Sequence, residues 1–260
     1  MKLHDIHYDM VFYKDGFFGY GEEGDFVQWS VAHIAPIAVT AAVILLIWIF
    51  RTRLRAWRHE ETARYWLGFF ILMFEMVYYW RLLYVGPADP GATTFMDRLP
   101  LQVCEWTSMI CFFALLKKSD VLFDMAYFLA TSTSFLPMLF PAVISNAGPT
   151  YFRYYQFWGA HLLPVIGMFW LMFVNEKRPH LRGILLCFGM LAILAGFAMV
   201  LNPLWDECNY LYLKPGQYEM LSFLPDSPFV MIGLYVLVLL PLMSLSYLAW
   251  KLIAGKKQAA

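Results

Sequence analysis

Charged residues are scarce in this sequence: they make up only 15% of its 260 residues, and the positive and negative charges balance. Soluble domains carry roughly 25% charged and roughly 45–50% apolar residues, whereas 61% of this chain is hydrophobic. A chain of this length has too little interior to hide that much apolar surface from water. The composition therefore excludes an ordinary soluble domain, and the absence of a basic patch speaks against nucleic acid as a partner.

Cysteines are also few, and internal repeats are lacking. The four cysteines have no paired spacing, which argues against a zinc ribbon or a disulfide scaffold. No spacing predicts a metal site or a cofactor, and residues 1–26 are polar and acidic, unlike the apolar core of a signal peptide. The lack of a repeat fits poorly with secondary transporters that are built from repeated halves.

What the sequence does contain is a series of long apolar stretches. A membrane-spanning helix needs roughly 20 mostly apolar residues. Seven stretches meet this requirement, at 28–50, 65–86, 99–116, 120–144, 152–174, 182–204 and 228–250. The expected fold is therefore all-α: a single transmembrane domain over residues 1–260, forming a polytopic membrane helix bundle of about seven transmembrane helices.

The distribution of lysine and arginine predicts the orientation of this bundle, because cytoplasmic loops are enriched in both residues. Thirteen of the 19 lie at one set of span ends and five at the other, which leaves only Arg81 inside a span. The richer set includes the loop 51–64, while the amino-terminal tail on the opposite side is acidic. We therefore expect the amino terminus outside and the carboxyl terminus in the cytoplasm.

Polar and ionisable side chains within the spans are unevenly distributed. Such groups are costly in hydrocarbon unless they are paired or hydrated. Given the alternating direction of the spans, most of them fall in the outer half of the membrane or at its outer boundary: His33, Arg81, Gln102, Cys104, Glu105, Arg153, Gln156, His161, Asn202, Cys208 and Asn209. This pattern predicts a polar cavity that opens outward, or sideways to the outer leaflet.

Cys104 is the candidate nucleophile. Pro100 suits the first turn of a helix, which would place Cys104 about one turn in, near the partial positive helix end that favours a thiolate. Ser108 and Cys111 follow on the same face. The alternative is a cysteine that serves as a small apolar filler.

Two histidines and an arginine present similar choices. His161 lies about ten residues, or ~15 Å, into the fifth span, roughly two turns deeper than Cys104. Both His161 and His33 are either functional groups or structural hydrogen bonds between helices. Arg81 either pairs with Glu105 on another helix, extends to the outer headgroups, or anchors a phosphate or carboxylate.

Other features have structural interpretations. The aromatic stretches 78–80 and 151–158 are typical of a membrane interface. Asp124, toward the inner side, is expected to be a buried hydrogen-bonding group or a partner of the inner-loop bases. Prolines within the spans predict kinks or locally open backbone; they are Pro137, Pro141, Pro164 and Pro203.

Several stretches resemble the YwaF family of bacterial membrane proteins. The Leu-Pro-Leu-Gln-Val-Cys segment at 99–104 resembles the start of a middle helix in that family. His33, the segment 151–157 with His161, and the segment 209–213 occur in the same order. The resemblance implies a bacterial cytoplasmic (inner) membrane protein, with its polar cavity toward the extracytoplasmic side.

That family is similar to an animal transmembrane acyltransferase that remodels ether phospholipids. The resemblance implies a cysteine nucleophile at Cys104 and a catalytic histidine at His161. The wider group also includes membrane hydrolases with a threonine–histidine pair, in which Cys104 would replace the threonine.

A lipid acyltransferase or lipid hydrolase is therefore the first expected function. The Cys104 thiolate would attack a phospholipid acyl ester, and His161 would act as general base and then acid. The membrane lipid, a phospholipid or lysophospholipid, would contact the remaining polar residues: His33, Arg81, Gln102, Glu105, Arg153, Gln156, Asn202 and Asn209.

A transporter, channel or small-ligand-binding membrane protein is the alternative, with Glu75, Glu105 and Arg81 as its ionisable core. A role in assembling another membrane protein also stays open, and the sequence does not set the oligomeric state. A disulfide between Cys104 and Cys208, which an outside location permits, would block the nucleophile and weaken the enzymatic interpretation.

Overall fold

The computed structural model describes residues 16–19, 25–85, 99–141, 147–205, 208–214, 224–225 and 227–255, without the side chains of 80–85 and 253–255. Within these residues all regular structure is helical and there is no strand. The all-α prediction is therefore confirmed.

The helices follow the predicted spans closely. They are α2 (Val31–Arg55), α3 (Glu60–Val85), α4 (Val103–Lys117), α5 (Asp120–Leu129), η2 (Ala130–Ser134), α6 (Phe135–Leu139), α7 (Phe152–Phe173), α8 (Arg182–Leu204), η4 (Tyr210–Tyr212) and α9 (Pro228–Gly255). The helix α5 continues through the π-helical turn η2 into α6, so these three elements form one kinked rod. The predicted span 120–144 corresponds to this rod, and its residues 142–144 lie outside the described part.

Five of these rods are long and apolar enough to cross a membrane: α2, the α5–η2–α6 rod, α7, α8 and α9 up to Leu252. The helix α3 is long enough but carries Glu75 and Arg81 among its apolar residues. The helix α4 has only 15 residues, so at 1.5 Å per residue it covers about 22 Å of a hydrocarbon core of about 30 Å. A polytopic helical bundle is thus confirmed. Among the rods that form it, α4 is the shortest.

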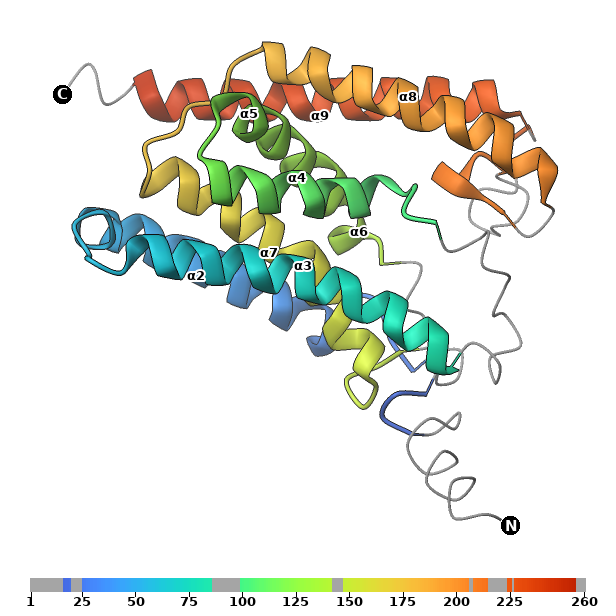
Figure 1. Cartoon of the computed structure of the whole chain (residues 1–260), viewed down its shortest axis with the longest axis horizontal. Coiled ribbons are helices and arrows are strands. Elements are labelled where there is room, and N and C mark those ends of the chain that lie inside the picture. Colours follow the sequence, from blue (N-terminus) through green and yellow to red (C-terminus); the bar gives the residue numbers. More distant parts are fainter. Residues whose placement is uncertain are drawn as a thin grey trace.

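The helices pack in a consistent order (Figure 1). The helix α7 contacts α2, α3 and α4; α4 contacts α5; and α5 contacts α8. The helices α8 and α9 lie along the opposite side of the molecule from α2 and α3. Because α2, α8 and α9 bury only about a fifth of their residues or less, these three helices form most of the apolar outer surface. Cys104, Glu105, Arg153, Gln156 and His161 lie on the inner helices α4 and α7.

Successive rods run in opposite directions, so their connections alternate between two ends of the bundle (Figure 1). The end that holds the turns after α2, α4 and α7, and the end of α9, is the arginine- and lysine-rich end identified in the sequence. At this basic end Asp124 is fully buried and accepts from the His180 N–H (3.0 Å) and from Arg182 Nε (2.7 Å). The prediction that Asp124 partners the bases of the loop is therefore confirmed.

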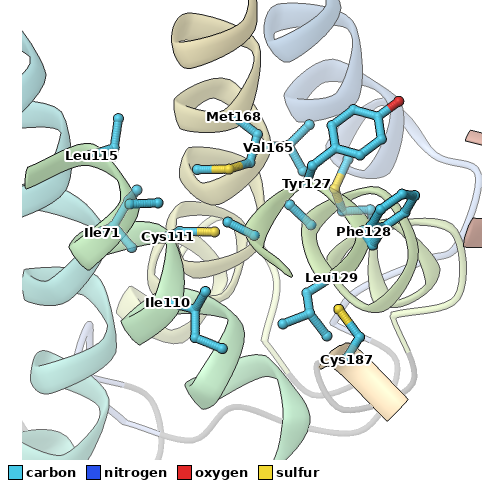
Figure 2. Close-up of a cluster of buried hydrophobic side chains, with 14 of the residues drawn as sticks. Ile71, Ile110, Cys111, Leu115, Tyr127, Phe128, Leu129, Val165, Met168 and Cys187 are labelled. Carbon is cyan, nitrogen blue, oxygen red and sulfur yellow. The ribbon is translucent and has the colours of Figure 1, made fainter. Parts of the chain in front are cut away.

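The core is apolar and closely packed (Figure 2). Ile71, Leu115 and Met168 bring α3, α4 and α7 together. Gly167 on α7 permits this approach, because a Cβ there would come within 3.1 Å of Leu115 Cδ1. Leu115 and Gly167 are therefore at the same height in the bundle, which gives a reference point for the polar residues above them.

Candidate active site

Cys104 lies in the first turn of α4, as predicted, but the helix begins later than the sequence suggested. Gln102 is its N-cap, in extended conformation, and the Glu105 carboxylate accepts from the Gln102 backbone N–H at 2.9 Å. Pro100 therefore precedes the helix, and its predicted place in the first turn is wrong. The reason is the Gln102–Glu105 capping box, which fixes the first turn at Val103.

The Cys104 thiol is free and partly accessible. No disulfide joins Cys104 to Cys208, so the thiol is not blocked. Its hydrogen-bond partner is the Thr133 carbonyl in η2, 4.0 Å from Sγ. Cys111, two turns further along α4, is instead fully buried among apolar side chains, as is Cys187 (Figure 2). The apolar-filler interpretation thus describes Cys111 and Cys187, while Cys104 has polar surroundings.

Charged groups from three helices surround Cys104. The side chains of Glu75, Glu105 and Arg153 are close enough for their charges to act on the Cys104 sulfur. Glu75 is buried, and its carboxyl lies beside the buried Ser108 hydroxyl. A polar cluster therefore lies at the junction of α3, α4 and α7.

Glu105 has both oxygens engaged. One accepts from the Tyr79 hydroxyl at 2.6 Å and the other from the Gln102 N–H. Tyr79 lies in a stretch predicted as an interfacial belt, but its hydroxyl points to this buried carboxylate. The geometry gives Glu105 a role in capping α4 and joining it to α3, rather than a free oxygen for a ligand.

Arg153 and Gln156 form a second polar pair, on α7. The Arg153 guanidinium donates to Gln156 Oε1 and stacks on the Tyr78 ring at 4.5 Å. Gln156 in turn donates to the Phe74 carbonyl at 3.0 Å. Gln156 and Tyr78 therefore hold the Arg153 guanidinium in place, and only one of its nitrogens is engaged in the described part of the chain. Such a guanidinium can donate to a carboxylate, a phosphate or an oxyanion.

His161 is buried on α7, and its tautomer follows from its contacts. Nδ1 lies 2.8 Å from the Phe157 carbonyl, so this nitrogen carries the proton in the neutral ring. The Nε2 lone pair is then the basic site, and no described group bonds to it. The imidazole also stacks on the Phe157 ring, with the centroids 4.4 Å apart. The Phe157 carbonyl and ring therefore hold the imidazole in one orientation.

Cys104 and His161 are not in contact, and no hydrogen bond joins them. Cys104 lies 11 residues before Leu115 on α4, and His161 lies six residues before Gly167 on α7. These helices run in the same direction but are inclined to one another (Figure 1). Helix rise alone corresponds to a difference of about 7 Å, roughly one and a third turns. The sequence predicted a gap of about two turns.

His33 has a structural environment. Its Nδ1 accepts from the Trp29 N–H at 2.9 Å, and Nε2 donates to the Met138 carbonyl at 2.7 Å. With both nitrogens engaged and the side chain fully buried, His33 joins α2 to α6. Arg81 lies in the last turns of α3, and its side chain is outside the described part.

The three remaining amide side chains fold the segment 208–214 over the start of α4. Asn202 exchanges two hydrogen bonds with the Tyr210 backbone, at 3.0 and 2.8 Å. Asn209 does the same with Lys214 at 2.9 Å, and Gln102 Oε1 accepts from the Leu211 N–H at 3.0 Å. These contacts support positive φ at Leu211 and Tyr212. The amides therefore shape the wall of the cluster rather than face into it.

Reasoning from the sequence missed the backbone and hydroxyl contacts beside Cys104. The backbone forms the π-helical turn η2, and Thr107 and Thr133 are in hydroxyl contact at 2.9 Å. The sequence pattern that could have indicated this turn is the run Thr-Ser-Thr-Ser at 131–134, which ends three residues before Pro137. In the described part of the chain, no three histidine, cysteine or acidic side chains converge as a metal site would require.

The family model described as the TMEM164 family matches residues 28–247, which include every residue of the polar cluster. The chain belongs to the TMEM164 family. No curated protein and no solved structure matches it. TMEM164 proteins are membrane proteins, in agreement with the helical bundle and its apolar outer surface. For this TMEM164 member the match establishes the family but not a reaction.

Proposed function

We propose that this protein is a membrane-embedded lipid acyltransferase or lipid hydrolase with a Cys104 nucleophile and a His161 general base. One observation carries the proposal: a free, partly accessible thiol lies in the first turn of α4, within range of the Arg153 guanidinium on α7. Helix starts favour negative charge, and a thiolate is the nucleophilic form of cysteine. The resemblance to a membrane acyltransferase family with a cysteine nucleophile supports the same assignment.

The reaction would proceed in two acyl transfers. Cys104 Sγ attacks the carbonyl carbon of a phospholipid ester, and the thiol proton passes to His161 Nε2. The imidazolium returns this proton to the departing glycerol oxygen, which leaves a thioester on Cys104. A lysophospholipid hydroxyl or water then gives its proton to Nε2 and takes the acyl group. The thioester C–S bond breaks, and the imidazolium returns the proton to the Cys104 sulfur.

This mechanism has two further requirements. The gap between Cys104 and His161 has to close when substrate is bound, as catalytic hydrogen bonds that are long without substrate can do. The developing oxyanion needs donors, and the unoccupied Arg153 nitrogens are the best placed. Substrate contacts at Arg153 are therefore proposed, whereas Gln156 supports it from behind.

The test is an assay in lipid nanodiscs with a phospholipid labelled in one acyl chain. Wild-type protein is expected to release labelled fatty acid, or to form a new labelled phospholipid when lysophospholipid is added. The two products distinguish hydrolase from transferase. Absence of both products across phospholipid headgroups, with folded protein, would contradict the proposal.

An apolar groove offers a place for an acyl chain. It has a volume of about 490 Å³ and is lined by Leu101, Trp106, Leu185, Leu186, Gly189, Met190, Ile193, Leu194 and Phe197. Leu101 and Trp106 place one edge of this groove at the start of α4, the helix that carries Cys104. Gly189 has open space where a Cβ would lie, so a larger side chain there would fill the groove without a clash.

We predict that Gly189→Leu shifts acyl-chain preference toward shorter chains. The leucine would occupy groove volume that a long chain needs, so the rate ratio of long to short chains should fall several-fold. Gly233→Leu on α9 is the matched control, because Gly233 also has open space around it but lies outside the groove. Equal ratios in both variants would show that the acyl chain does not occupy the groove.

The orientation is proposed as well: amino terminus outside, carboxyl terminus in the cytoplasm, in a bacterial inner membrane, with residues 1–260 forming one transmembrane domain. The charge rule carries this proposal. A fluorescent protein that folds only in the cytoplasm, fused after residue 260, should fluoresce. A periplasmic phosphatase at the same position should be inactive, and the reverse pattern would invert the assignment of the two ends.

The alternative function, a transporter, channel or ligand-binding protein, is favoured by one observation. Glu75 is buried near the middle of α3, and no ion pair joins it to a described side chain within contact distance. Intramembrane carboxyls of this kind are common in ion and proton pathways. Uptake or ligand-dependent stabilisation that survives Cys104→Ser would support this alternative over the enzyme.

A further inference from the structure

The carbonyl group of Thr133 lacks its normal helical donor. In an α-helix the C=O of residue 133 would accept from the N–H of residue 137. That residue is Pro137, which has no N–H to donate. The sequence therefore leaves one carbonyl of the α5–η2–α6 rod available to another group, in the middle of the bundle.

The π-helical turn holds this carbonyl in position. Hydroxyls of three consecutive residues donate to the carbonyls one turn before them: Thr131 to Tyr127 at 2.7 Å, Ser132 to Phe128 at 2.5 Å and Thr133 to Leu129 at 2.9 Å. Such side-chain bonds compete with regular helical pairing. Wide π turns are rare and frequent at functional sites.

Two residues of α4 contact this turn. Cys104 Sγ lies 4.0 Å from the Thr133 carbonyl oxygen, and Thr107 Oγ1 lies 2.9 Å from Thr133 Oγ1. Thr107 and Thr133 are both buried, and Thr107 Oγ1 also lies 2.8 Å from the Val103 carbonyl. Because each hydroxyl has one proton, one of the two donates across the pair and the other donates to the carbonyl of its own helix. The hydroxyl pair therefore fixes the height of η2 against the first turn of α4, next to the thiol.

We propose that Thr133 is a positioning residue for Cys104: its carbonyl, freed by Pro137 and braced by Thr107, orients the thiol in the polar cluster. The proposal rests on the nucleophilic role of Cys104 for its consequence in catalysis. The carbonyl accepts from the S–H, so it fixes the rotamer from which the sulfur turns toward substrate. Losing this contact should free the thiol for small reagents but misplace it for acyl transfer.

Two variants remove the contact in different ways. Pro137→Ala restores an N–H that competes for the Thr133 carbonyl, and Thr133→Val removes the brace to Thr107. Pro241→Ala, a proline inside α9, and Thr131→Val, whose hydroxyl bonds only its own helix, are the controls. Two rates are measured in nanodiscs: alkylation of the Cys104 peptide by a membrane-permeant iodoacetamide, followed by mass spectrometry, and acyl transfer.

The expected result is a pair of opposite changes. Both variants should alkylate about fivefold faster and transfer acyl groups about fivefold slower, the rate equivalent of one ordinary hydrogen bond, while both controls match wild type. Alkylation within twofold of the controls would overturn the positioning role, even if Cys104→Ala is inactive. Activity that persists in Cys104→Ala would instead contradict the proposed function, and the alkylation rates would still decide how the thiol is held.

Discussion

Acyl transfer is expected to disappear in Cys104→Ala and to fall by about 10²–10⁴-fold in His161→Gln, the usual contribution of a general base. The first change removes the atom that carries the acyl group. The second keeps the size and polarity of the side chain but removes the basic Nε2. Initial rates with labelled phospholipid in nanodiscs measure both effects.

Matched controls separate chemistry from folding. Cys111→Ala removes a thiol from the same helix face, within the apolar core, and His59→Gln changes an exposed histidine at the basic end. Both should retain most of the wild-type rate. If His161→Gln were as active as His59→Gln, His161 would be a structural hydrogen bond and Cys104 would need another base, with Glu75 the nearest unassigned candidate.

The largest expected loss of stability is in Glu60→Ala, about 3–5 kcal/mol, the usual cost of removing one partner from a buried ion pair. Glu60 accepts from Trp170 Nε1 at 3.0 Å and from Asn175 Nδ2 at 2.9 Å. It also pairs with Lys118 and with the fully buried Arg64, both at 3.4 Å. Its removal disconnects the ends of α3, α4 and α7 at once.

Glu61→Ala is the natural comparison, because Glu61 is exposed and only 3.5 Å from the same arginine. A surface pair of this kind contributes about 0–1 kcal/mol. Thermal unfolding in detergent should therefore separate the two variants clearly. Similar melting temperatures would show that the Glu60 contacts do not hold the basic end together.

The same carboxylate predicts a pH dependence. Burial acts to raise the pKa of Glu60, but hydrogen bonds from Trp170 and Asn175 and the charges of Lys118 and Arg64 outweigh it and hold the pKa below 4.5. Its stabilising contribution is therefore complete above about pH 4.5 and is lost as the pH falls through the lower folded value. The difference in melting temperature between wild type and Glu60→Gln should shrink as the pH is lowered from 7 to 3.

The arrangement of spans was readable from the sequence because hydropathy and length are local properties. The predicted span 182–204 coincides with α8, and 152–174 differs from α7 by one residue. The start of α4 was misplaced by several residues because it depends on a hydrogen bond between Gln102 and Glu105, which hydropathy does not report.

The site was less predictable, since it depends on contacts between distant segments. Composition and spacing placed Asn202, Asn209 and Gln102 at the same end of the bundle, where the structure brings them together. They did not predict that these side chains bond to the backbone of 208–214. Likewise, nothing local to His33 showed that both of its nitrogens bond to backbone groups. The π turn beside Cys104 required Pro137 to be considered together with the hydroxyl residues before it.

The central claim is that Cys104 carries the acyl group, and trapping that intermediate tests it most directly. Wild-type protein in nanodiscs is incubated with a phospholipid of defined acyl chain, quenched in acid, digested and analysed by mass spectrometry. We predict one acyl adduct, on the Cys104 peptide, that neutral hydroxylamine removes as expected of a thioester. Product formation with Cys104 unmodified throughout, and undiminished in Cys104→Ala, would contradict it.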